Sequence, residues 1–196
     1  MRAVFLDIEA TGLDVRSHSP IDIAFKIIDL TVDIQEQSYQ ALICPSEKAW
    51  QCRDFNSMQV NGYTWEQLQQ GKDIAQVSRE IIEIFALFHI ERGRALFICQ
   101  NPAFDRGFFS HIVDPYLQDK LHWPYHWLDL ASMYWIITML RCHTRGLSCA
   151  ESVQLSKNAI AQSFSLPPEV EPHRALNGVE HLIICYKALL NSSLMI

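Results

Sequence analysis

The stretch that decides the fold lies at the start of the chain, where residues 2–13 read RAVFLDIEATGL. Apolar Val4, Leu6 and Ile8 recur at every second position. A period of two is typical of a β-strand with one buried face. The sequence therefore predicts a strand over Arg2–Glu9, from which the rest of the sheet is built.

Two acidic residues, Asp7 and Glu9, occur two positions apart in this strand. Side chains with that spacing point to the same face. Neighbouring carboxylates repel each other unless a cation lies between them, and hard oxygen ligands favour Mg²⁺ or Mn²⁺. The alternative is a solvent-exposed strand end with both acids hydrated. Gly12 follows at once, and a glycine there lets the turn backbone approach a ligand closely.

In the rest of the chain, strand-like runs come first and are followed by helix-like runs with one inserted strand. Asn101-Pro102 is a preferred helix start, because Asn can cap free amides and Pro fits the first turn. We expect an α/β fold with a mixed β-sheet flanked by α-helices. The further predicted strands are Ile21–Leu30, Gln37–Cys44 and Ala95–Cys99, and the predicted helices are a short one from Thr64, Ile74–Phe88, one from Asn101, Leu128–Leu140, Ala159–Phe164 and Arg174–Leu190.

Composition excludes several classes of protein. The 196 residues are 49% hydrophobic and 19% charged, which is typical of a globular chain and predicts one domain over residues 1–196. The formal net charge of −6 argues against a long basic groove for duplex nucleic acid, since the overall field repels polyanions. Without a signal peptide, a membrane-spanning run or a C-x-x-C pair, the expected location is cytoplasmic, with no membrane contact.

Two further motifs contain candidate functional side chains. Asp105 lies one turn into the helix predicted from Asn101, where an acid also has a plain helix-dipole explanation. His173 precedes another predicted helix, and the positive end of that helix lowers the proton affinity of an imidazole. Such a histidine suits a general base, with capping or packing as the alternative.

Taken together, D-x-E-x-T-G-L at 7–13, N-x-x-F-D at 101–105 and H-R-A-L at 173–176 resemble the successive motifs of the DEDDh 3′→5′ exonucleases. That family includes the proofreading epsilon subunit of bacterial DNA polymerase III, RNase T and oligoribonuclease. The segments at 60–64 and 127–129 are also similar to the family's, so the resemblance covers nearly the whole chain.

The resemblance implies a ribonuclease-H-like fold and a site for two Mg²⁺ or Mn²⁺ ions. Asp7, Glu9 and Asp105 would be metal ligands, and His173 would deprotonate the attacking water.

Nucleotide contacts follow from the same resemblance. Backbone near Ala10 and Thr11 would meet the terminal 3′-hydroxyl. Leu13 would lie beside the terminal base, and Phe104 would stack on a base. The alternative for Leu13 and Phe104 is an ordinary core position.

One departure from the family pattern concerns the fourth acid, an Asp five residues after the histidine, where this chain has Gly178. At about 100° of rotation per residue, neither Asn177 nor Glu180 points in the direction of position 178 in a regular helix. Asn177 would offer a neutral oxygen only in an irregular turn, and Glu180 would reach the site only if the glycine breaks or shifts the helix. We therefore expect one of the two metal ions to bind more weakly.

The sequence leaves two functions open. The first is a metal-dependent 3′→5′ exonuclease that hydrolyses terminal phosphodiester bonds of single-stranded DNA or short RNA. The second is a catalytically impaired pseudo-exonuclease that binds nucleic-acid ends or a protein. The expected partners are single-stranded 3′ ends, and a homodimer or an association with a polymerase stays open.

Overall fold

The computed structural model describes residues 1–146 and 153–193. Its strands are β1 Arg2–Ala10, β2 Pro20–Asp29, β3 Ile34–Leu42, β4 Ala95–Cys99 and β5 Trp127–Asp129. Its helices are α1 Glu47–Gln51, α2 Phe55–Asn61, α3 Trp65–Leu68, α4 Ile74–Leu87, α5 Pro102–Ile112, α6 Pro115–Lys120, α7 Leu130–Thr144, α8 Lys157–Ser163 and α9 Ala175–Ser193.

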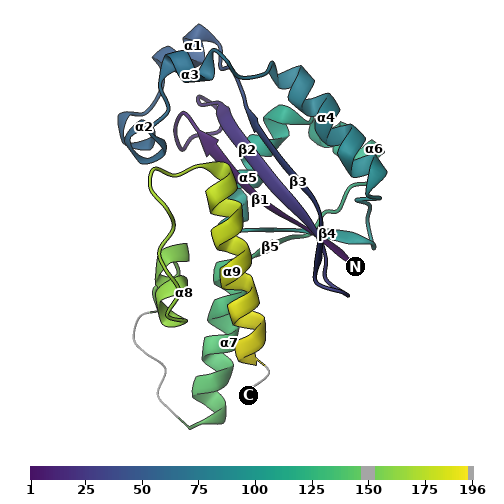
Figure 1. The fold of residues 1–196 in the computed structure, drawn as a ribbon, viewed down its shortest axis with the longest axis vertical. Coiled ribbons are helices and arrows are strands. Elements are labelled where there is room, and N and C mark those ends of the chain that lie inside the picture. The colour runs from purple at the N-terminus through teal and green to yellow at the C-terminus, as the bar shows by residue number, and fades with distance from the viewer. Residues whose placement is uncertain (147–152, 194–196) are drawn as a thin grey trace.

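The strands form one mixed sheet in the order β3-β2-β1-β4-β5, with helices on both faces (Figure 1). Strands β1, β2 and β3 are an antiparallel meander, and β4 and β5 add in parallel on the other side of β1. This is the ribonuclease-H-like architecture that the sequence predicts. Strand β4 pairs only with residues 2–5 of β1, so β1 continues past the end of its neighbour.

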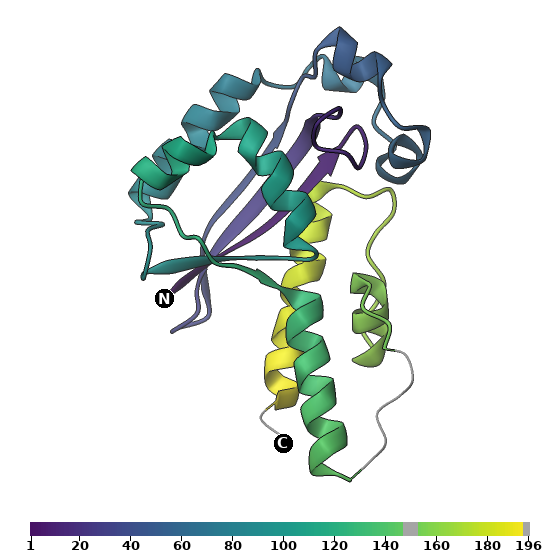
Figure 2. The ribbon, with the colours of Figure 1, turned by 180° about the vertical axis from the view of Figure 1, so that it is seen from behind.

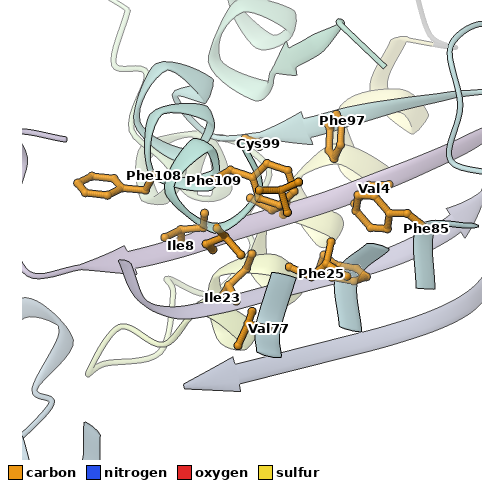
Figure 3. Packing of buried hydrophobic residues seen from close by; sticks show 14 of the residues in the cluster. Val4, Ile8, Ile23, Phe25, Val77, Phe85, Phe97, Cys99, Phe108 and Phe109 are labelled. Atoms are coloured by element: carbon orange, nitrogen blue, oxygen red, sulfur yellow. The ribbon is translucent and has the colours of Figure 1, made fainter. Parts of the chain in front are cut away.

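One face of the sheet carries the larger apolar core, which Figure 3 shows in close view. Val4, Leu6 and Ile8 of β1 are buried there against α4 and α5. Aromatic rings fill much of the space, with Phe85 of α4 in edge contact with Phe25 of β2 at 5.1 Å between centroids. The period-two pattern in the sequence thus marks the face that α4 and α5 cover.

The opposite face packs on α7, α8 and α9, which also contact one another (Figure 2). Ala3 and Phe5 of β1 point to this side and meet Val179 and Leu182 of α9. Asp7 and Glu9 follow at the same spacing of two. Helix α9 runs alongside β1 and so brings its N-terminal turns to the acidic end of that strand (Figure 1).

The structure departs from the sequence prediction in several elements. Helices α1, α2 and α6 were not predicted, since five to seven residues are too short for an apolar period to emerge. The helix expected over Leu128–Leu140 begins two residues later, because residues 127–129 form β5. Asn101 precedes α5 but makes no side-chain cap, since its backbone is left-handed with φ 56°.

Two further expectations, on membrane spans and on cysteines, can be compared with the described residues. None of the described helices is long and apolar enough to cross a bilayer. Five of the six cysteines are free thiols, and the sixth, Cys149, lies outside the described residues.

Candidate functional site

The four residues with predicted catalytic and metal-binding roles meet in one pocket of about 370 Å³. Asp7 and Glu9 come from β1, Asp105 from α5 and His173 from the segment before α9. The chain thus brings together residues up to 166 positions apart, counted from 7 to 173.

Asp105 reaches the pocket because β1 extends beyond the end of its neighbour β4. Beyond Phe5, no strand among the described residues pairs with the β1 edge that faces β4. The Ile8 amide on this edge donates to Asp105 Oδ1 at 3.0 Å. Since Asp105 is 2% exposed, this bond both satisfies a buried donor and fixes the carboxylate beside the two acids of β1.

His173 is placed by a buried hydrogen-bond network. Its backbone amide donates to the Val60 carbonyl at 3.1 Å. Asp22 Oδ2 accepts from the Tyr63 hydroxyl at 2.6 Å and from the Ala175 amide at 3.0 Å. The Asp22 carboxylate therefore anchors the first turn of α9 to the sheet, and His173, two residues before that helix, lines the pocket.

Lys157 and Glu169 also line the pocket, and no motif in the sequence indicates either of them. Lys157 Nζ lies 2.9 Å from Glu169 Oε2, 3.4 Å from Asp7 Oδ1 and 3.3 Å from the Gly178 carbonyl oxygen. The side chains of Lys157 and Glu169 are 11% and 3% exposed. One signal for this cluster exists in the chain: Lys157 is the first residue of α8, where a positive charge opposes the helix dipole and needs acidic partners.

Gly178 lies against Asp7, inside an unbroken α9. A Cβ atom at this position would be 2.6 Å from Asp7 Cγ and closer still to Oδ2. Neither of the two candidate substitutes for the fourth acid reaches the pocket. Asn177 lines a separate hollow, and Glu180 forms a 2.7 Å ion pair with Lys26.

Burial and mutual repulsion shape the titration of the acids. Burial, with the charge of Glu169 adding to it, raises the pKa of Asp7 to about 6 against the opposing effect of Lys157. Burial and the Asp7 charge raise the pKa of Glu9 to about 8 and hold that of Asp105 well above its usual range. Burial lowers the pKa of Lys157, but its two acidic partners raise this pKa by a larger amount, so the net shift is upward. The pocket is therefore short of positive charge.

A second pocket of about 540 Å³ adjoins the first, because Glu9 and Phe104 line both. Ala10 and Leu13 also line this second pocket, and Leu13 is 78% exposed rather than part of the core. Phe104 packs against Phe108 with the two rings tilted by 58° and their centroids 4.8 Å apart, and it also lines both pockets.

Thr11 differs from the other predicted nucleotide contacts. It is fully buried and is not among the described residues that line either pocket. Its amide donates to the Ser19 carbonyl at 2.9 Å, and its carbonyl accepts from the Asp54 amide at 2.7 Å. Both backbone groups of Thr11 are thus used to hold the loop after β1.

The acids are not arranged as a ready-made metal site. Within residues 1–146 and 153–193, no three Asp, Glu, His or Cys side chains are grouped so that they could hold an ion. Two of the three predicted ligands already have protein partners, since Asp7 contacts Lys157 and Asp105 accepts from Ile8.

Comparison with known proteins adds sequence similarity to one nuclease. The chain is 25% identical to an oligoribonuclease from Cutibacterium acnes over 184 residues, which cover 92% of this chain and 80% of that protein. No protein-family model matches the chain.

Solved structures share the fold over 97% of this chain. Cell-death related nuclease 4 has a TM-score of 0.73 at 13% identity, and this chain covers 64% of it. The zinc-bound complex of E. coli exonuclease I with single-stranded DNA has a TM-score of 0.75 at 16% identity, with 40% of that protein covered. The nuclease domain of 3′hExo, a DEDDh family member bound to rAMP, has a TM-score of 0.69 at 13% identity, with 92% covered. The chain is thus similar in sequence to an oligoribonuclease, and it shares its fold with nucleases that include exonuclease I and 3′hExo.

Proposed function

We propose that this chain is a 3′→5′ exonuclease that hydrolyses the terminal phosphodiester bond of single-stranded nucleic acid. The observation that carries the proposal is the meeting of Asp7, Glu9, Asp105 and His173 in one pocket. A general base and three carboxylates around one cavity are the groups that metal-assisted phosphodiester hydrolysis requires.

The chemistry of the donor set suits one divalent cation, which would have to draw the three carboxylates of the pocket together. The Glu9 carboxylate has no hydrogen-bond or ion-pair partner among the described residues, and burial raises the pKa of all three acids. Carboxylate oxygens suit Mg²⁺ or Mn²⁺, so Asp7, Glu9 and Asp105 would hold the ion. When bound, it would supply Lewis acidity and neutralise charge on the attacked phosphate. A second ion does not fit, because position 178 offers no carboxylate and Lys157 already contacts Asp7.

His173 would act as the general base. Its side chain faces the same pocket as the acids, and its backbone is held by Val60 and by the anchored start of α9. Its imidazole would accept the proton of the attacking water. A base in this position contributes about 10²–10⁴-fold to the rate.

The adjoining pocket would hold the last nucleotides of the strand. Leu13 and Phe104 offer apolar surface to the bases, and Phe104 lies at the boundary between the two pockets. Stacking on an aromatic ring tolerates any base and contributes about 1–3 kcal/mol. Short-range contacts of this kind suit a chain with a net charge of −6, which cannot attract a long polyanion through its overall field.

The test is incubation of the pure protein with 5′-labelled single-stranded DNA and, separately, RNA in Mn²⁺. We expect a ladder of strands shortened from the 3′ end, absent in Asp7→Ala. A ladder that persists in Asp7→Ala would come from a contaminating nuclease and would count against the proposal.

A second function is favoured by the contact of Lys157 with Asp7 beside Gly178. If this contact keeps the ion out, the chain binds 3′ ends without cutting them. The same assay separates the two functions: retention of the labelled strand with no ladder, at any Mn²⁺ concentration, identifies an end-binding protein.

A further inference from the structure

The Lys157 ammonium is the one Lys or Arg charge among the described residues that line the acidic pocket. It lies among three oxygen atoms from three parts of the chain: Asp7 of β1, Glu169 of the loop before α9 and the Gly178 carbonyl of α9. An array of oxygens around a positive charge is also what a divalent cation requires.

The position of Lys157 is costly without those partners. A buried ammonium loses most of its hydration, and at the first position of α8 it also faces the positive end of the helix. Glu169 is itself tied to α8, since its amide donates to Asn158 Oδ1 at 2.8 Å. The ion pair is therefore built into the packing of α8 on the loop and is not a loose surface contact.

Gly178 makes this arrangement sterically feasible. The Asp7 carboxylate occupies the space into which a side chain at 178 would project. From there its Oδ1 reaches the Lys157 ammonium at 3.4 Å. A carboxylate at 178 and the present Asp7–Lys157 contact thus exclude each other. The absence of an acid at 178 is therefore what allows the buried Lys157 ammonium to contact Asp7.

We infer that the Lys157 ammonium takes the place of one divalent cation, so that the pocket binds a single metal ion and not two. The inference rests on the proposed function, since it concerns the cations of the same site. Lys157 neutralises Asp7 and Glu169 from one side, and the single ion is left to Glu9 together with Asp7 and Asp105.

The first experiment counts Mn²⁺ ions bound by the full chain, by calorimetric titration and by the loss of the free-Mn²⁺ resonance signal. We expect one ion for the wild type, and two for the double variant Lys157→Met with Gly178→Asp. Lys26→Met is the matched control. It removes an ammonium that is also paired with a glutamate, Glu180 of α9, but lies outside the pocket, so it is expected to leave the count at one. Two ions on the wild type would overturn the inference and leave the proposed function standing, whereas no bound ion would overturn both.

The second experiment uses stability and needs no nuclease activity. In the absence of metal, Lys157→Met leaves two buried acids without their cation, so its melting temperature is expected to fall below that of the wild type. Mn²⁺ is then expected to raise the melting temperature of Lys157→Met more than that of the wild type or of Lys26→Met. An equal increase in all three proteins would show that the ammonium does not occupy a cation position. If Lys157→Met does not fold, the ion count on the wild type decides.

Discussion

Gly178 of α9 and Asp7 of β1 are in direct contact, with no space for a Cβ atom between the helix backbone and the carboxylate. Ala normally stabilises a helix interior relative to Gly by about 1 kcal/mol. Here the added methyl group must displace Asp7 from Lys157, and overpacking of this kind costs about 1–3 kcal/mol. We therefore expect Gly178→Ala to lower the free energy of unfolding, measured by urea denaturation.

Gly107 provides the matched control for this prediction. It also lies inside a helix, α5, but a Cβ atom there would be 3.4 Å from Val15 Cγ2, an ordinary contact. Gly107→Ala should raise the free energy of unfolding by up to about 1 kcal/mol. Equal stabilisation by both substitutions would contradict the close contact between Gly178 and Asp7.

The raised pKa values predict how the metal-free protein responds to pH. An unfolded carboxyl group loses its proton near pH 4, whereas Asp7 keeps its proton to about pH 6 and Glu9 to about pH 8 in the folded state. Between these limits the folded state binds more protons, so the free energy of unfolding falls as the pH rises from about 5 to about 8. Urea denaturation in EDTA measures this slope, and Mn²⁺ should restore stability at pH 8.

Two variants locate the source of that slope. Glu9→Gln should flatten it, because the amide does not titrate. Asp14→Asn should leave it unchanged, since Arg16 lowers the pKa of Asp14 to about 2, below the range. A slope between pH 6 and 8 that is as steep in Glu9→Gln as in the wild type would show that Glu9 does not contribute to it.

Asp22 is expected to contribute strongly to stability through its two buried hydrogen bonds, which no motif in the sequence signals. Asp22→Ala leaves the Tyr63 hydroxyl and the Ala175 amide without their acceptor, at about 1–3 kcal/mol for each unsatisfied buried group. Asp33→Ala, which removes an exposed ion pair with Lys187, should change stability by no more than about 0.5 kcal/mol. Similar unfolding midpoints for both variants would argue against Asp22 as the anchor of α9.

His173 is predicted to affect the chemical step and not the binding of the ion. His173→Gln should lower the single-turnover rate by about 10²–10⁴-fold, with Mn²⁺ affinity unchanged. His126→Gln, an exposed histidine outside both pockets, should match the wild type. A parallel loss of Mn²⁺ affinity and rate in His173→Gln would instead make His173 a ligand.

Phe104 is predicted to bind the strand. Phe104→Ala should weaken binding of a fluorescent single strand by about 1–3 kcal/mol, the contribution of one stacked base. Tyr116→Ala removes an aromatic ring that is 87% exposed and lies outside both pockets, so it should not change the affinity measured by anisotropy. Equal affinities for Phe104→Ala and the wild type would assign this ring to the core alone.

The fold could be predicted where a periodic pattern of apolar residues continues over a long segment. Strand β1 and helices α4 and α9 have such periods, and they lie within a few residues of their predicted positions. The segment from 45 to 62 contains two short helices that owe their place to caps, such as Ser46 and Asp54, and to the left-handed turn at Gly62. A period of 3.6 cannot be recognised in five to seven residues.

For the pocket, prediction from the sequence was limited in a different way. Asp7, Glu9, Asp105 and His173 could be chosen because each belongs to a motif, and the structure places them together. Lys157 and Glu169 belong to none, and they meet only because α8 and the loop before α9 pack on the same face of the sheet. Such a contact depends on tertiary packing, which spacing along the chain does not encode.

The central claim, that this pocket hydrolyses the last phosphodiester bond at a 3′ end, is tested most directly with a 3′-labelled single strand and a matched strand blocked by a 3′-phosphate. With Mn²⁺ we predict release of the labelled terminal nucleotide as a nucleoside 5′-monophosphate from the free end, strongly reduced on the blocked strand and in Asp105→Asn. Internal cleavage, equal release from both strands, or release that Asp105→Asn leaves unchanged would contradict the claim.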